Sequence, residues 1–261
     1  MKKWHAKAGL LALIFISGCG GEKKELPVSL TAAETKEAPK AAEISVDPAT
    51  AATVKGRVSF EGEAPALRDL SVGGNPECAV FHPGGKIKSE ELLIRGGFVQ
   101  NVFVYVKEGL EGRVFGVPPR PVVIENKNCV YVPHVVGVEV GQEVELLNGD
   151  ATLHNIHSYS KSSKSWNLGL PFQGMKQLKK FSSPEIMVTL KCDVHPWMIG
   201  YVGVLPHPYF SVTAEDGRFE LKNLPPGEYT VEAWHEKLGV QTQTIKLEPR
   251  ETKEIEFKFS G

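Results

Sequence analysis

Neither sign of charge dominates this chain: 30 lysines and arginines face 31 aspartates and glutamates, for a formal net charge of −1 over 261 residues. Such a balance provides no overall attraction to nucleic acid or to an anionic surface. Long helical patterns are missing as well, whereas 26 glycines, 18 prolines and many short β-branched runs are present. The composition therefore predicts an all-β protein that does not bind nucleic acid.

A long apolar run is also lacking. The apolar stretch at residues 8–16 follows a basic start, is too short to span a bilayer, and has the pattern of a signal peptide. It leads into Ile-Ser-Gly-Cys, which resembles the lipobox of bacterial lipoproteins and implies cleavage before Cys19 and lipid on its sulfur. An ordinary secretory signal is the alternative, and both would export the protein. We therefore predict a signal peptide at 1–18 and a lipid anchor on the periplasmic side of the cell envelope, where Gly20 in place of aspartate favours the outer membrane.

Residues 19–53 contain the lipidated cysteine and then a segment rich in Ala, Glu, Lys, Pro and Thr, without sustained apolar periodicity. This composition predicts a disordered tether. As a flexible coil the tether would span roughly 30–35 Å. It would allow the domain that follows to move between partners, although a passive spacer would have the same composition.

Sulfur and imidazole side chains are few, yet three of them lie in the short segment Lys-Cys-Asp-Val-His-Pro-Trp-Met, as Cys192, His195 and Met198. The segment follows a strand pattern in which alternate residues from Ile186 to Cys192 share one apolar face. Pro196 favours a turn after the strand. The turn would bring all three side chains toward one point.

A fourth candidate lies upstream. Residues 136–148 alternate as two strands, and Asn-Gly-Asp at 148–150 predicts a turn after them. The chain then reads Leu-His-Asn-Ile-His, with His154 and His157 an odd number of residues apart, so on a strand they point to opposite faces. We select His154 as the candidate ligand and leave His157 out.

A thiolate, two imidazoles and a thioether are the ligand set of a type 1 (blue) copper site, so we predict one copper ion on His154, Cys192, His195 and Met198. Zinc also binds cysteine and histidine but rarely recruits methionine. A fold of this kind without bound metal is the remaining alternative.

The two ligand segments together resemble the cupredoxin family, most of all amicyanin, plastocyanin and pseudoazurin, over residues 119–206. The resemblance implies an eight-stranded Greek-key sandwich with copper near one end. It also implies outer-sphere electron transfer through the partly exposed ring of His195. Asn155, directly after the first histidine, would tie the two ligand loops together.

The remaining strands resemble a second family. The stretch Thr-Ala-Glu-Asp-Gly-Arg-Phe-Glu-Leu-Lys-Asn-Leu-Pro-Pro-Gly-Glu-Tyr-Thr-Val-Glu-Ala, within residues 207–261, is similar to the carboxypeptidase regulatory-like (transthyretin-like) sandwich. The first strands of that family correspond to residues 54–118. We therefore expect residues 54–118 and 207–261 to form one split sandwich with the cupredoxin inserted into it. A continuous cupredoxin with extra N-terminal strands and a small C-terminal module is the alternative. Neither resemblance suggests peptidase activity.

Two cysteines, Cys78 and Cys129, are left after the lipid and metal positions are assigned. In an oxidising compartment they most simply pair. The disulfide would contribute roughly 4 kcal/mol in the chain-entropy model. The alternative is a second metal site that also uses His82 and His134.

These features together predict a one-electron carrier rather than an enzyme. Multicopper enzymes need His-x-His pairs, which this sequence lacks, and copper storage calls for methionine clusters, whereas only Met175, Met187 and Met198 follow the signal. A copper-binding trafficking or storage protein and a metal-free interaction module on the same scaffold are the alternative functions. The expected partners are redox proteins such as a cytochrome or a copper protein or enzyme. They would be acidic if the lysines between the ligand segments steer them, namely Lys161, Lys164, Lys176, Lys179, Lys180 and Lys191.

Overall fold

The computed structural model describes residues 46–261. The predicted signal peptide, the lipidated Cys19 and most of the tether lie outside the described residues. Within the described part, no helix has the length and apolar character needed to cross a membrane.

Strands from both ends of the described chain pair in two sheets. The first sheet has the order β17 (Arg218–Leu224), β1 (Ala52–Glu61), β5 (Phe98–Val99) and β4 (Ile94–Arg95), and β20 (Thr252–Ser260) pairs with β1 in parallel. The second sheet has the order β16 (Phe210–Val212), β6 (Phe103–Glu108), β18 (Gly227–His235) and β19 (Gly239–Leu247). Their inner faces share one apolar core, which includes Val58, Val104, Leu221 and Val231.

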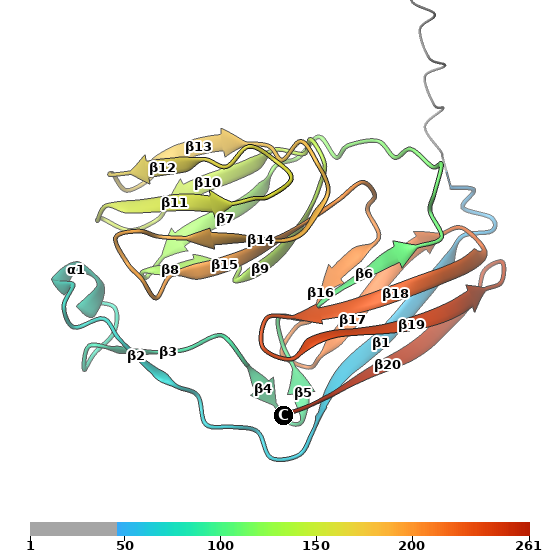
Figure 1. Ribbon diagram of the computed structural model, residues 1–261, viewed down its shortest axis with the longest axis horizontal. Coiled ribbons are helices and arrows are strands. Elements are labelled where there is room, and N and C mark those ends of the chain that lie inside the picture. Colours follow the sequence, from blue (N-terminus) through green and yellow to red (C-terminus); the bar gives the residue numbers. More distant parts are fainter. Residues whose placement is uncertain (1–45) are drawn as a thin grey trace, which may run out of the picture. The chain divides into compact units, whose positions relative to one another are not determined.

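The middle of the chain forms two further sheets around a core of their own (Figure 1). One has the order β13 (Lys176–Lys179), β10 (Val144–Asn148), β7 (Val122–Lys127) and β8 (Val130–Val132). The other has the order β12 (Asn167–Leu170), β11 (His154–Tyr159), β14 (Glu185–Lys191), β15 (Ile199–Leu205) and β9 (Val135–Glu139). The pairs β7–β10 and β9–β15 are parallel, so the chain crosses between the sheets as in a Greek key.

The predicted fold class is thus confirmed: an all-β chain with a Greek-key sandwich and a second small β-sandwich. The middle sandwich has a 4-stranded and a 5-stranded sheet among the described residues, one strand more than the eight that the resemblance implies.

The strand that leads to the ligand loop follows the predicted alternation only in its second half. Val188 and Leu190 of β14 are buried, and Cys192 directly after it is buried too. Ile186 is 37% exposed, so its predicted place on the apolar face was wrong. The reason is a register shift between Glu185 and Val188 against β15, which displaces the start of the strand from the alternation.

The two sandwiches meet at a small apolar cluster formed by Phe103, Tyr105, Val135 and Leu205. Two glycines make the close approach possible. A Cβ at Gly203 would lie 2.5 Å from the Phe103 ring, and one at Gly137 would lie 2.3 Å from the Phe210 ring. A side chain at either position would therefore push these rings away.

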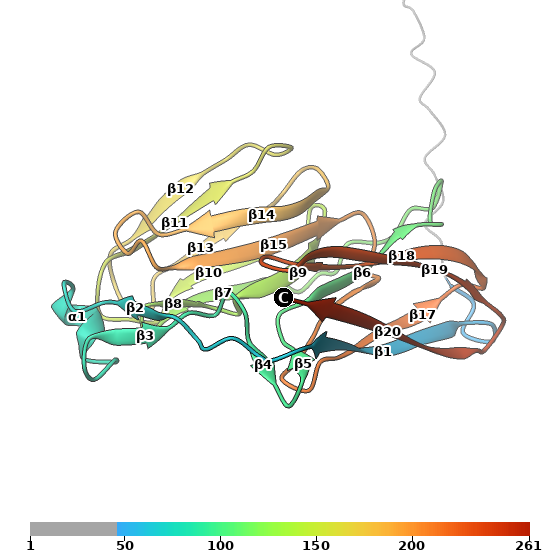
Figure 2. The same ribbon diagram turned by 60° about the horizontal axis from the view of Figure 1, so that its bottom comes forward.

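A long excursion between β1 and β4 leaves the first sandwich. It contains β2 (Asp69–Ser71), the short helix α1 (Pro76–Ala79) and β3 (Lys86–Lys88), and β2 pairs with β3. We call residues 69–88 the arm. The arm lies beside β8 in two views of the chain (Figures 1 and 2), and the disulfide Cys78–Cys129 ties it to the turn between β7 and β8.

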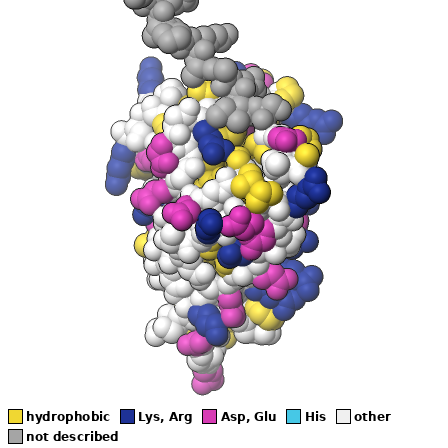
Figure 3. Space-filling model, turned by 90° about the vertical axis from the view of Figure 1, so that its right-hand side faces the viewer, with side chains coloured by type: hydrophobic (Ala, Val, Ile, Leu, Met, Phe, Trp, Pro, Cys, Tyr) yellow, Lys and Arg dark blue, Asp and Glu magenta, His cyan; other side chains and the backbone are white. Residues whose placement is uncertain are grey.

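The surface charges follow the balanced composition. Acidic and basic side chains are interspersed over the face drawn in Figure 3, without a large area of one sign. That face therefore offers no single-sign field for a charged partner.

Candidate metal centre

A turn held by side-chain hydrogen bonds places His154 at the end of the middle sandwich. The Asn148 side chain donates to the carbonyls of Thr152 and Leu170, at 2.8 Å each, and accepts the Asp150 N–H at 3.0 Å. The turn signal Asn-Gly-Asp is thus held by its own first side chain. β11 begins at His154, whose side chain is 0% exposed.

The ligand loop folds back on itself directly after β14. The Cys192 N–H donates to the Met198 carbonyl at 3.2 Å, and the Met198 N–H donates to the His195 carbonyl at 2.9 Å. These bonds close the turn that Pro196 favours. Met198 is 1% exposed and belongs to the same apolar cluster as Cys192.

Three candidate ligand atoms converge in the interior. The Nδ1 atoms of His154 and His195 are 3.0 Å apart, and Cys192 Sγ lies 3.5 Å from His195 Nδ1. All three residues are buried, and their ligand atoms lie within 4.8 Å of one another. Two nitrogens or a nitrogen and a sulfur bound to one metal ion are separated by roughly 3–4 Å. The donor set therefore fits a single soft or borderline ion without rearrangement of the backbone.

The electrostatics favour a thiolate at Cys192 and a protonated imidazole at His154. Burial raises the pKa of Cys192, but hydrogen bonds with His154 and His195 outweigh it and lower the pKa to about 6. Burial lowers the pKa of His154, but hydrogen bonds with Asp150 and Cys192 raise it above its usual value. A proton shared among these groups is what a bound cation would replace.

Asp150 is a site residue that sequence reasoning treated only as part of a turn. Its Oδ2 lies 2.9 Å from His154 Nε2 and accepts the Cys129 N–H at 2.8 Å, while its Oδ1 accepts the Asn128 N–H at 2.7 Å. Burial raises the pKa of Asp150, but the bonds from His154 and the two N–H groups lower it more. With its Nε2 directed at the carboxylate, His154 presents Nδ1 to the centre. The signal in the sequence was an acid four residues before the ligand.

Asn155 lies between the two ligand segments. Its Oδ1 accepts the Asp193 N–H at 2.7 Å and lies 3.2 Å from Cys192 Sγ. Its Nδ2 donates to Asn167 Oδ1 at 2.8 Å and to Asp193 Oδ2 at 3.0 Å. The side chain is therefore bonded to the residue after the candidate cysteine ligand and to the neighbouring strand.

The arm closes the His195 end of the centre. His195 is 2% exposed, so the expectation of a partly exposed ring was wrong. The cause lies in the disulfide: the sulfurs of Cys78 and Cys129 and a ring nitrogen of His195 lie within 4.8 Å of one another. The indole N–H of Trp197, in the ligand loop, donates to the Cys129 carbonyl at 2.9 Å and so links this loop to the disulfide.

The disulfide prediction is confirmed, and the second metal site proposed as its alternative is not formed. Cys78 and Cys129 are bonded at 2.04 Å. His82 Nε2 lies 2.7 Å from the Asn128 carbonyl oxygen, and His134 Nε2 lies 2.5 Å from Glu236 Oε1. Both imidazoles therefore contact other groups, and the loose Cys-to-His spacings in the sequence did not indicate a metal site.

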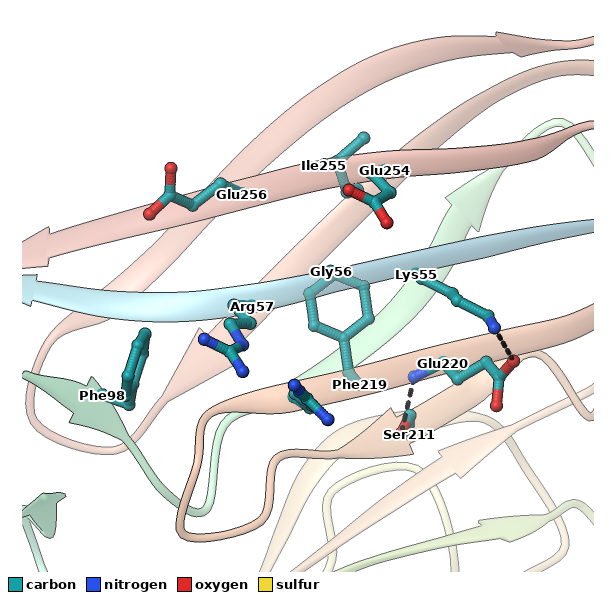
Figure 4. A pocket seen from close by; sticks show the side chains of 11 residues that line it. Lys55, Gly56, Arg57, Phe98, Ser211, Phe219, Glu220, Glu254, Ile255 and Glu256 are labelled. Atoms are coloured by element: carbon teal, nitrogen blue, oxygen red, sulfur yellow. Dashed lines mark hydrogen bonds and ion pairs between the residues drawn. The ribbon is translucent and has the colours of Figure 1, made fainter. Parts of the chain in front are cut away.

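Two hollows lie outside the centre. A cavity of about 120 Å³ borders Met198 and Trp197 and is also lined by His134, Glu90 and Glu236. A wider, open groove of about 1030 Å³ lies over β1, β17 and β20 (Figure 4). Cations and carboxylates alternate along that groove, as in the ion pair between Lys55 and Glu220 at 3.4 Å. This is the pattern of a solvated sheet face.

Comparison with known proteins gives limited similarity. No protein-family model matches the chain. Among curated proteins, a rhamnogalacturonate lyase from Dickeya dadantii (strain 3937) is 24% identical over 216 residues, which are 77% of this chain and 35% of that protein. The chain therefore spans about a third of the length of that relative.

Several solved structures match between 32% and 40% of the chain. A Cu-containing nitrite reductase (NirK) from Thermus scotoductus SA-01 is 22% identical with a TM-score of 0.32, over 40% of this chain and 25% of that chain. A Cu(I) form of a mutant amicyanin is 23% identical with a TM-score of 0.29, over 34% of this chain and 85% of that chain. A purple cupredoxin from Nitrosopumilus maritimus is 26% identical with a TM-score of 0.28, over 32% of this chain and 98% of that chain. TM-scores this low carry no argument about the site, which is therefore assigned from its own residues.

Proposed function

We propose that this protein is a type 1 copper protein that carries single electrons between redox partners. The observation that supports the proposal is the convergence of His154 Nδ1, His195 Nδ1 and Cys192 Sγ in a buried position. Imidazole and thiolate together form the trigonal ligand plane of blue-copper sites, and Met198, held in the same loop, is the candidate axial ligand. The bound copper ion would supply a one-electron couple, Cu(I)/Cu(II).

The protein residues would keep the ligand positions constant in both oxidation states. Asp150 orients His154, Asn155 links the ligand segments, and the disulfide packs against His195. Fixed ligands lower the structural change that accompanies electron transfer. We assign the protein no catalytic role, because the proposed donor set leaves a substrate no place on the ion.

The proposed setting is the periplasmic side of the envelope, with the lipid on Cys19 and the tether as the anchor. The partners would be a cytochrome or another copper protein. Of the lysines between the ligand segments, Lys176 pairs with Glu145 at 2.7 Å and Lys180 with Glu143 at 3.4 Å. The steering charge toward an acidic partner therefore rests with the other four.

The experiment is a Cu(II) titration of the full chain followed by visible absorption and electron paramagnetic resonance. We expect an intense blue or green absorption with narrow copper hyperfine splitting, saturating at one ion per chain. The Cys192→Ser variant should lose the colour, whereas Cys78→Ser/Cys129→Ser should keep a thiolate-to-copper band. Tetragonal spectra, or a colourless wild-type protein, would leave copper trafficking or a metal-free interaction module as the better description.

A further inference from the structure

A second group of possible ligands lies next to the candidate centre. The sulfurs of Cys78 and Cys129 and a ring nitrogen of His195 lie within 4.8 Å of one another, and all three residues are at most 2% exposed. In the oxidised form the two sulfurs are bonded to each other as a disulfide. In the proposed electron carrier they serve only as the disulfide that packs against His195.

Reduction would turn this group into a ligand set. A dithiol reductant supplies two electrons and two protons: the S–S bond breaks, two thiols form on the protein, and the reductant becomes a disulfide. A monovalent cation that binds both sulfurs then displaces the two thiol protons. Two thiolates are soft ligands, which select Cu(I), and imidazole also suits copper.

His195 is the imidazole that can complete the set. Within the described chain, both hydrogen bonds of its ring run through Nδ1, toward His154 and Cys192, which leaves Nε2 available. The group Cys129, Asp150 and His154 lies equally close together. However, both oxygens of Asp150 already accept backbone N–H groups, and His154 Nε2 is bonded to that carboxylate. A carboxylate is also a hard ligand, poorly suited to Cu(I).

We propose that the reduced Cys78 and Cys129, together with His195, form a second metal site that binds Cu(I). A neutral imidazole has one free lone pair, so His195 serves the two sites in turn rather than both at once. The site stands or falls independently of the electron-carrier function, because it needs neither Cys192 nor Met198.

The test uses the full-length Cys192→Ser variant, in which the neighbouring centre lacks its thiolate. Its Cu(I) affinity is measured without oxygen by competition with a coloured Cu(I) chelator, in the disulfide form and after reduction with dithiothreitol and removal of the reductant. We expect the dithiol form to bind Cu(I) at least 100-fold more tightly. Cys19 is present in both forms and so does not contribute to the difference.

Two further variants in this background test the third ligand. His195→Asn should weaken Cu(I) binding by the dithiol form at least 10-fold. His82→Asn is the matched control, because His82 lies on the arm four residues after Cys78 but bonds to the Asn128 carbonyl instead. It should leave the affinity unchanged.

Two results would overturn the proposal. One is an affinity that does not rise on reduction. The other is an equal effect of His195→Asn and His82→Asn. X-ray absorption of the Cu(I)-loaded dithiol form decides the matter if a variant fails to fold: two sulfurs and one nitrogen are expected, and sulfur ligands alone would contradict the site. The blue spectrum of the wild-type disulfide form tests the electron-carrier function separately.

Discussion

At the scale of single residues, Asp150 accounts for much of how the centre is held. One buried carboxylate bonds to the imidazole of His154 and to the N–H groups of Asn128 and Cys129. Asn128 and Cys129 have φ values of 53° and 58°, in the left-handed region that non-glycine residues rarely adopt. The carboxylate thus stabilises a costly turn and orients His154, a candidate metal ligand, at the same time. The candidate ligands were chosen from the sequence, whereas Asp150 was placed only in a turn, because its contacts involve a hairpin more than 20 residues away.

Asp150→Asn should raise the reduction potential of bound copper. The carboxylate increases electron donation by His154 and so stabilises Cu(II) more than Cu(I). A tenfold change in the relative affinities corresponds to about 59 mV for one electron, and we expect a rise of roughly this size. The measurement is a spectroelectrochemical titration, with Asp216→Asn on a distant hairpin as the charge control. A potential that is unchanged or lower would show that the carboxylate does not act through His154.

Two buried histidines in the other sandwich should make stability fall in acid. Burial lowers the pKa of His207 and of His235, in each case to about 4. Both rings are neutral in the folded chain, so their contribution is complete above the unfolded pKa of about 6.5 and is lost as pH falls toward 4. By pH 5 each ring should cost about 2 kcal/mol.

The check is guanidinium unfolding at pH 7 and pH 5 for the wild type and His207→Gln. The variant should be less stable than the wild type at pH 7, because Gln replaces a packed ring that bonds to the Val106 carbonyl. Its further loss between pH 7 and pH 5 should be smaller. Equal losses in both proteins would assign the acid sensitivity to other groups.

At the scale of elements, strands were predictable because alternation reports which face is buried. Residues 136–148 contain two strands, β9 and β10, as that pattern indicates. β14 departs from the alternation at Ile186, where its register against β15 shifts. Such a shift depends on how two strands pair, so the sequence of one strand alone does not reveal it. The arm was not predictable, since its short elements gain their position from a disulfide rather than from periodicity.

Gly203→Ala in β15 should destabilise the contact between the sandwiches. The added Cβ would meet the Phe103 ring at 2.5 Å, and overpacking of this kind costs roughly 1–3 kcal/mol. Gly169→Ala in β12 is the control, because nothing lies within 4 Å of its Cβ position. Denaturant midpoints of the two variants provide the comparison, and equal midpoints would mean that Phe103 moves aside without cost.

Removal of the arm's covalent tie should have a larger effect. Cys78→Ser/Cys129→Ser opens a loop with a sequence separation of 51 residues, which corresponds to roughly 4 kcal/mol of unfolding free energy. Hydrogen exchange should become faster in residues 69–88. A loss below about 1 kcal/mol, with unchanged exchange, would show that packing alone holds the arm over His195.

At the scale of the whole molecule, strands from both ends of the described chain share one core, and the middle of the chain forms another. The sequence predicted two β-sandwiches and the residue types of the centre. It did not predict that His195 is enclosed, because the enclosing sulfurs come from separate parts of the chain. The domain boundaries at 54–118, 119–206 and 207–261 and the lipid anchor on Cys19 remain predictions.

Enclosure of His195 changes what is expected of electron exchange. In the proposed carrier a partner could not touch the ring while the arm is in place, so electrons would pass through the surrounding protein, and the potential should respond little to added salt or small anions. The fixed ligands should nevertheless let the ion change oxidation state without leaving.

The most direct test of the proposed function is a redox titration of the copper-loaded full chain, followed by its blue absorption and its copper content. We predict one reversible one-electron couple, with identical oxidative and reductive curves and one copper ion retained per chain throughout. Loss of copper on reduction, or a couple that is not reversible, would contradict the electron-carrier function and indicate a protein that hands copper on.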